Sequence, residues 1–185
     1  MPSSIQRRSG APLTKQVNLT RCAARIIAMS RVCIQSGDFD LGAETEALRL
    51  EDGGVGAVVA FVGTVREHSA GQAVSQMELE HYPGMTEAAI EAMVDEALAR
   101  FDIRAARVIH RVGTLQARDQ IVLVLVTSAH RGQAFQACEF LMDYLKTQAP
   151  FWKKEYTPEG AHWVDARVAD DEALARWGIA AGNAS

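Results

Sequence analysis

Residues 55–66 read Val-Gly-Ala-Val-Val-Ala-Phe-Val-Gly-Thr-Val-Arg, and this stretch decides the fold. From Val55 to Val62 the residues are almost all apolar and many are β-branched, which predicts a strand buried on both faces. The strand is expected to end at residues 63–66, where Arg66 places a cation beside a buried element. A buried strand needs partner strands and covering helices, so the flanking sequence has to provide both.

The flanking sequence predicts further strands and helices in mixed order. Apolar runs predict strands at residues 31–35 and 121–126, and alternating polarity predicts half-buried strands at 74–82 and 107–112, with a last strand near 163–168. Apolar periodicity and capping residues predict helices from Asp40 to Leu50, after Gly84, from Ala129 to Thr147, and after Asp170 or Asp171. Residues 113–119 are expected to form a turn. Strands that directly follow one another, at two places, favour an α+β fold over a doubly wound sheet.

Two apolar stripes predict the core faces of the long helices. The first stripe consists of Ile90, Met93, Val94, Ala97, Leu98 and Phe101. The second consists of Ala134, Phe135, Cys138, Leu141, Met142 and Leu145. Pro150 prevents the second helix from continuing.

Composition excludes several classes of protein. The chain has 185 residues, 48% of them hydrophobic, and no apolar run approaches the roughly 20 residues of a membrane-spanning helix. Cysteines at 22, 33 and 138 and five scattered histidines lack metal-ligand spacing, so we expect no metal and no cofactor. The cysteine pattern fits a reducing compartment, and we expect a cytoplasmic protein.

Charge is distributed unevenly along the chain. Residues 1–37 contain six basic residues and no acidic one, so the remainder carries a strong negative excess that argues against nucleic-acid binding. We interpret residues 1–30 as a dispensable basic extension, residues 31–177 as the functional domain and residues 178–185 as a tail. Two other interpretations are weaker: a twin-arginine signal at Arg7 and Arg8, and a transit peptide formed by the basic, acid-free segment as a whole.

Three segments place cations at the ends of apolar elements. The first is Gly63 to Arg66. The second, Ser128 to Arg131, opens a helix, where unpaired backbone N–H groups and the helix dipole favour an anion. The third runs from Lys146 to Glu155. Lys146 lies at the margin of the apolar stripe, where its stem can be buried and its amine partly desolvated.

Each of these residues also has a purely structural interpretation. A lysine at a helix end usually complements the dipole, Arg66 could be an ordinary loop cation, and His130 could be a helix cap. Cys138 lies in an apolar stripe and is more typical of packing than of a nucleophile. His81 and His110 fall on strand faces and are expected to be structural. Residue chemistry alone therefore indicates a cationic pocket for a small anion and names no reaction.

Six blocks, in order, resemble the large, MoaE-type subunit of molybdopterin synthase. The blocks are Gly56 to Arg66, Leu79 to Met85, Ile109 to Gly113, Thr127 to Arg131, Met142 to Glu155, and Gly160 with Trp163-Val164. The resemblance covers residues 31–177. It implies an α/β hammerhead fold with an additional antiparallel β-sheet.

The resemblance also implies an activity and partners. The family inserts two sulfurs into cyclic pyranopterin monophosphate, and each sulfur arrives as a thiocarboxylate on the C-terminal glycine of a small ubiquitin-like subunit. Large subunits form a homodimer, which gives a heterotetramer with the small subunits. Carried over by position, the catalytic residues are Lys146 and Lys153, and the substrate-binding residues are Thr64, Val65, Arg66, His130, Arg131, Lys146, Lys153, Lys154, Glu155 and, from the neighbouring protomer, Arg167.

Two other functions compete with this sulfurtransferase. The chain could be a non-catalytic module that docks a ubiquitin-like tail, or a thiol enzyme that uses Cys138. A pair of lysines in one segment favours the sulfurtransferase, because docking alone does not require a desolvated lysine.

Overall fold

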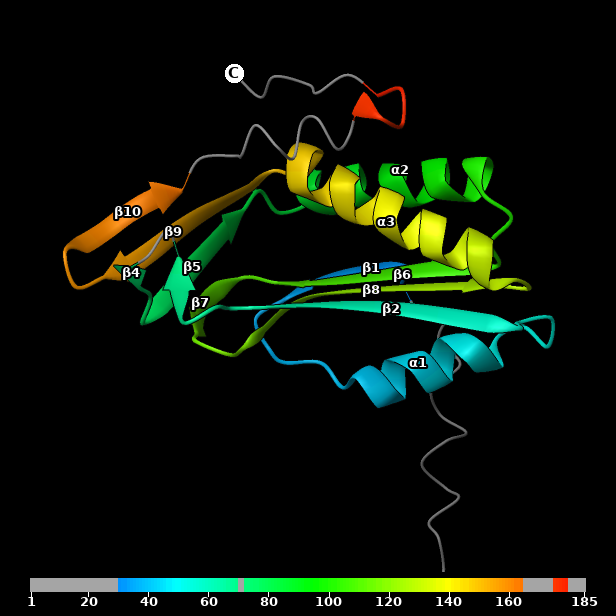
Figure 1. Ribbon diagram of the computed structural model, residues 1–185, viewed down its shortest axis with the longest axis horizontal. Coiled ribbons are helices and arrows are strands. Elements are labelled where there is room, and N and C mark those ends of the chain that lie inside the picture. The colour runs from blue at the N-terminus through cyan, green and yellow to red at the C-terminus, as the bar shows by residue number, and fades with distance from the viewer. Residues whose placement is uncertain (1–29, 70–71, 165–174, 180–185) are drawn as a thin grey trace, which may run out of the picture.

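The computed structural model describes residues 30–69, 72–164 and 175–179 (Figure 1). Arg167, the expected helix after Asp170 or Asp171, and nearly all of the predicted extension lie outside the described residues.

A four-stranded central sheet forms the middle layer. Its strands, in spatial order, are β1 (Val32–Gln35), β6 (Ala105–Arg111), β8 (Gln120–Ser128) and β2 (Ala57–Thr64). β1 pairs with β6 in parallel, and the other pairs are antiparallel. Helices α2 (Met85–Arg100) and α3 (Arg131–Gln148) cover one face, and α1 (Leu41–Leu50) covers the other (Figure 1).

A second sheet extends from one end of the first. Its order is β10 (Gly160–Val164), β9 (Phe151–Thr157), β5 (Gln76–His81) and β7 (Gly113–Gln116), and all its pairs are antiparallel. A small hairpin of β3 (His68–Ser69) and β4 (Gln72–Ala73) lies between β2 and β5 in the chain. The α+β architecture with an added antiparallel sheet is therefore confirmed.

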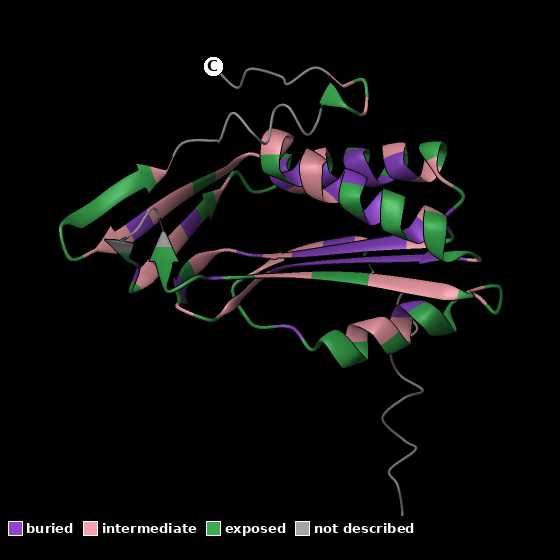
Figure 2. Ribbon diagram, viewed as in Figure 1, coloured by how far each residue is buried: buried purple, intermediate pink, exposed green. Residues whose placement is uncertain are grey.

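The core is centred on β8, where every residue from Val122 to Ser128 is buried (Figure 2). One set of its side chains, including Val124 and Val126, packs with α2 and α3. The opposite set, Leu123 and Leu125, packs under α1 with Leu48. The strand predicted from the apolar run at residues 121–126 is therefore confirmed, and from Val122 onwards it is buried.

The predicted burial of residues 55–62 on both faces is wrong. β2 is an edge strand with β8 on one side only, and its residues are half-buried or exposed. Phe61 is 38% exposed. An apolar run of this kind predicts that the strand is covered, but it does not show whether the covering residues belong to the same chain.

Two strands were not predicted, because their sequence patterns were too short or too charged. The expected turn at 113–119 contains β7, and β9 begins directly after Pro150.

Burial also differs from the prediction on β6 and α3. β6 is buried from Ala106 to Ile109, without the expected alternation, because helices cover both faces. Phe135 is 62% exposed, and Phe140 takes the buried place on α3.

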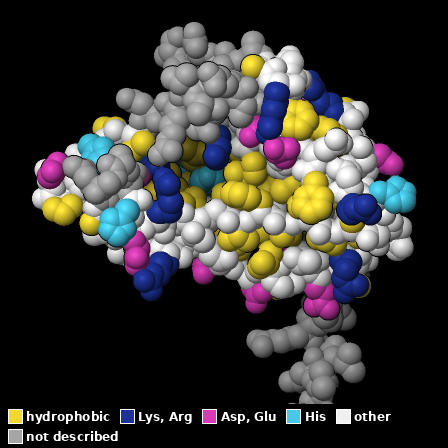
Figure 3. Space-filling view, viewed as in Figure 1, with side chains coloured by type: hydrophobic (Ala, Val, Ile, Leu, Met, Phe, Trp, Pro, Cys, Tyr) yellow, Lys and Arg dark blue, Asp and Glu magenta, His cyan; other side chains and the backbone are white. Residues whose placement is uncertain are grey.

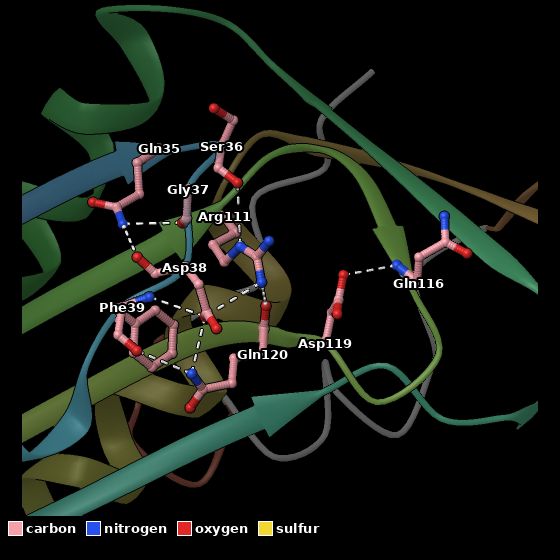
Figure 4. Close-up of polar contacts among 9 residues, drawn as sticks. All are labelled: Gln35, Ser36, Gly37, Asp38, Phe39, Arg111, Gln116, Asp119 and Gln120. Atoms are coloured by element: carbon pink, nitrogen blue, oxygen red, sulfur yellow. Dashed lines mark hydrogen bonds and ion pairs between the residues drawn. The ribbon is translucent and has the colours of Figure 1, made fainter.

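A polar cluster fixes the ends of β6 and β8 beside the second sheet (Figure 4). The guanidinium of Arg111 donates to the carbonyl oxygens of Ser36 and Gln120 and to the carboxylate of Asp38. The Gln120 side chain donates to the same carboxylate at 2.9 Å and to the carbonyl of Phe39. These contacts hold the segment between β1 and α1 against the end of β6, next to His110.

Gly113 allows the chain to pass directly from β6 to β7. Its φ is 81°, and a Cβ built there would meet nothing within 4 Å. We therefore predict that Gly113→Ala lowers the free energy of unfolding by about 1–2 kcal/mol through backbone strain alone. Gly37→Ala is the matched control, since Gly37 also has open space but no positive φ, and it should cause no loss. Urea unfolding of both variants tests the prediction, and equal stability of the two would contradict it.

Candidate active site

A cavity of about 330 Å³ lies where α3 ends and the two sheets meet. Its apolar walls include Phe61, Leu79, Ile121 and Met142. Its polar lining comes from Thr64, His110, Lys146 and Lys153, which belong to β2, β6, α3 and β9. Figure 3 shows lysine or arginine side chains beside a band of hydrophobic ones on this side of the molecule. The structure thus brings together three of the expected site residues: Thr64, Lys146 and Lys153.

Both lysines reach this cavity because Pro150 separates α3 from β9. Lys146 lies in the last turn of α3, and its side chain is exposed in the single chain. The expectation of a partly desolvated amine is therefore not met by this chain alone. After Ala149, which caps the helix, β9 begins at Phe151, so Lys153 lies two residues along the strand and lines the same cavity.

Lys153 is held by a buried carboxylate. Its Nζ is 2.7 Å from Oε1 of Glu155, and Glu155 is only 4% exposed. The imidazole Nε2 of His162 is 3.9 Å from the other carboxylate oxygen. A buried carboxylate is tolerated only with such partners, and in return it holds the ammonium group of Lys153 at a fixed position.

Lys154 is not brought into this cavity. Successive residues of a strand point to opposite faces, so Lys154 lies on the other face of β9 from Lys153. Its ammonium group lies 5.4 Å from the ring centre of Trp163 and 5.5 Å from that of Tyr156. The Tyr156 hydroxyl in turn donates to Glu78 at 2.8 Å.

His130 and Arg131 line a second, more open depression of about 560 Å³ with Gly56 and Ala57. Both are exposed at the start of α3, and His130 makes no side-chain cap. A Cβ at Gly56 would lie 2.4 Å from the carbonyl oxygen of Ala129, so only glycine allows this close approach. At 1.5 Å per helical residue, His130 and Lys146 are about 24 Å apart along α3. His130 and Arg131 therefore form a cluster separate from the lysine cavity.

Arg66 and Val65 line neither cavity. Val65 is 2% exposed, and its backbone bonds to residues 118 and 119. Arg66 is exposed in the loop that follows β2.

Sequence reasoning missed His110 as a site residue. Its Nδ1 lies 2.9 Å from the carbonyl oxygen of Arg111, and its ring stacks on Phe151 with centroids 3.9 Å apart. Burial lowers the pKa of His110 to about 4. The only available signal was its place in the Ile109 to Gly113 block, because a strand-face histidine by itself indicates a structural role.

Cys138 is a poor nucleophile. It is 5% exposed, and burial, with the nearby Glu139 carboxylate, raises the pKa of its thiol to about 11. The thiolate is the reactive form, so it is scarce at neutral pH. This argues against the thiol-enzyme interpretation.

Within residues 30–69, 72–164 and 175–179, no group of three or more His, Cys, Asp or Glu side chains could hold a metal ion. No helix in these ranges is long and apolar enough to cross a membrane.

His110 makes stability depend on pH. Its pKa falls from 6.5 in a free side chain to about 4 in the folded chain, so the unfolded state binds more protons within that window. The contribution of the neutral His110 ring to the free energy of unfolding is complete above pH 6.5 and is lost as the pH falls from 6.5 to about 4. We predict that going from about pH 7.5 to about pH 5 reduces the free energy of unfolding through this group by about 2 kcal/mol. His110→Phe is the control without a titrating ring, and equal pH slopes in urea unfolding would contradict the prediction.

Comparison with known proteins identifies the family. The MoaE protein family model matches residues 34–148. A molybdopterin synthase catalytic subunit from Ralstonia nicotianae is 62% identical over 157 residues, which cover 85% of this chain and 89% of that protein. A solved MoaE protein from Burkholderia ambifaria is 56% identical, with a TM-score of 0.71, over 82% of this chain and 99% of that one. A solved molybdopterin synthase from Staphylococcus aureus is 32% identical, with a TM-score of 0.67, over 74% and 98%. This chain, with its lysine cavity at one end of α3 and its cationic helix start at the other, belongs to the MoaE family.

Proposed function

We propose that this chain is the catalytic subunit of a molybdopterin synthase. It inserts sulfur from the thiocarboxylated C-terminus of a small ubiquitin-like subunit into cyclic pyranopterin monophosphate, giving the dithiolene of molybdopterin. The observation that carries the proposal is one cavity with two lysines and largely apolar walls, in a member of a family whose relatives are named for this activity. The cytoplasm is the expected compartment.

The charges of the substrates fit the cavity. A cyclic phosphate and a thiocarboxylate are both anions, whereas the chain carries a formal net charge of −4. Local cations must therefore overcome a negative background and hold two anions together, which is catalysis by positioning and charge stabilisation. Entry of the partner's tail would also cover Lys146 and provide the desolvation that the single chain lacks.

The two lysines are proposed to have different tasks. When the thiocarboxylate sulfur has displaced an oxygen substituent from a substrate carbon, the bond between the sulfur and the carbonyl carbon of the small subunit must still break. The Lys146 amine can attack the carbonyl carbon and give up a proton, which leaves the acyl group on the lysine. Alternatively, water attacks the carbonyl carbon and Lys146 moves the proton. Either attack releases the sulfur to the substrate. Lys153, fixed by Glu155 at 2.7 Å, stabilises the negative charge that develops on the carbonyl oxygen.

The position of the phosphate site implies a second copy of the chain. His130 and Arg131 offer a helix start and a guanidinium for the phosphate, but they lie about 24 Å from Lys146 along α3. One small substrate cannot contact both clusters of the same chain. We therefore propose that a homodimer brings the His130 end of one protomer to the lysine cavity of its partner. The exposed edge of β2 is available for such an interface, and Arg167 is proposed to join from the neighbouring protomer.

Mixed dimers test this arrangement. Lys146→Ala and Arg131→Ala should each abolish turnover, because each removes one half of every site. Random exchange of the two inactive variants should restore about a quarter of the wild-type activity, because half of the dimers are mixed and each contains one intact composite site. Mixing either variant with itself is the control. If the mixture stays inactive although exchange is demonstrated by mass, each site lies within one chain.

The charge-conserving variant Lys146→Arg tests the chemistry of Lys146. An arginine keeps the positive charge but does not lose its proton near neutral pH, so we predict that sulfur transfer remains almost abolished. Docking of the small subunit should be unchanged. Anaerobic turnover with the thiocarboxylated partner measures the first effect and calorimetry the second. Substantial turnover in Lys146→Arg would show that only charge matters.

The same assay separates the enzyme from a docking module. A module that only binds a ubiquitin-like tail would bind the partner as tightly as an enzyme and release no dithiolene product from wild-type protein.

A further inference from the structure

His110 lines the lysine cavity, and the family resemblance implied no role for it. It is near the end of β6 and lines the cavity with Lys146, Lys153 and Phe151. Its ring stacks on Phe151 with an interplanar angle of 18°. The Arg111 guanidinium, with the segment that it holds, fixes the adjacent end of the strand (Figure 4). The imidazole is therefore held at a fixed orientation.

The contact with Arg111 defines the tautomer of this imidazole. A carbonyl oxygen can only accept, so Nδ1, at 2.9 Å from the Arg111 oxygen, carries the hydrogen. Burial keeps the ring neutral near neutral pH by lowering its pKa to about 4. The other nitrogen, Nε2, must then present a lone pair. Across the part of the chain that the structure describes, Nε2 makes no hydrogen bond.

This lone pair differs from the charged groups of the cavity. Protonated Lys146 and Lys153 only donate hydrogen bonds, so they bind the anionic parts of a substrate. They cannot recognise the N–H groups of a heterocyclic ring. A neutral acceptor at a fixed position beside an aromatic ring can do so, and it disfavours an analogue that lacks the donor.

We propose that His110 is a substrate-orienting residue whose Nε2 accepts a hydrogen bond from a ring N–H of the reduced pterin. The inference rests on the proposed function, because that function supplies the pterin. It adds a specific contact for the uncharged ring, whereas the lysines, His130 and Arg131 bind the charged groups.

Two conservative variants separate this role from a structural one. His110→Asn can keep the donor to the Arg111 carbonyl, since its amide nitrogen takes the place of Nδ1, but it removes the acceptor. His110→Gln can place its side-chain oxygen near the position of Nε2. Binding of cyclic pyranopterin monophosphate is measured on the complex with the small subunit in its unreactive carboxylate form. We expect Asn to weaken binding about tenfold or more and Gln to stay within about threefold of wild type.

Wild-type binding to a pterin methylated at the donor nitrogen provides a test that does not depend on how the variants fold. The methyl group should weaken binding to wild type but have little further effect on His110→Asn. The proposal would be overturned if His110→Asn bound the pterin as tightly as wild type, or if His110→Asn and His110→Gln lost equal affinity. In either case the packing of the imidazole ring would be its only role. Tight binding with reduced turnover in Asn would also overturn it, because the acceptor would then serve a lysine. If wild type bound no pterin at all, the proposed function itself would fail.

Discussion

The burial of β8 constrains everything around it. Seven consecutive residues, Val122 to Ser128, have almost no contact with solvent, so protein must lie on both faces and both edges of the strand. Sheet neighbours β6 and β2 provide the edges, α1 provides one face, and α2 with α3 provides the other (Figure 1). The side chains of α3 that meet this requirement include Ala134 and Leu141, both without accessible surface. The position of α3 is therefore fixed by the core and not by the site.

The fixed position of α3 determines where the chemistry can occur. A helix packed along its whole length is a rigid spacer, and His130 with Arg131 lies at one end of it and Lys146 at the other. No side-chain movement closes a gap of about 24 Å. The same packing leaves β2 as an edge with apolar side chains such as Phe61 exposed. In this chain a requirement of the core thus separates the two halves of the proposed site and also leaves exposed the edge of β2, which we propose as the interface with a second copy.

Sequence patterns predicted the parts of the fold in which one physical signal dominates. β8, α2, α3 and the Asp40 cap of α1 follow from apolar runs, helical periodicity and a capping side chain, and Asp40 does accept from the Ala43 N–H at 3.0 Å. Two strands of the second sheet were missed, β9 because it carries three charged residues and β7 because it has only four residues. That omission also affected the site. Had residues 151–157 been interpreted as a strand, alternation would have placed Lys154 on the opposite face from Lys153.

The contrast between the two lysines follows from their secondary structure. Lys153 lies on a strand, where the residue two positions later shares its face, and that residue is the buried Glu155. The carboxylate loses hydration on burial, and its cationic neighbour offsets part of that cost, so moving Lys153 away would leave a costly buried charge. Lys146 lies in the exposed last turn of α3, at the rim of the same cavity. An anchored cation suits the stabilisation of charge at one point, and an exposed amine at a helix end suits an approaching thiocarboxylate, so the different tasks proposed for the two lysines agree with their places in the fold.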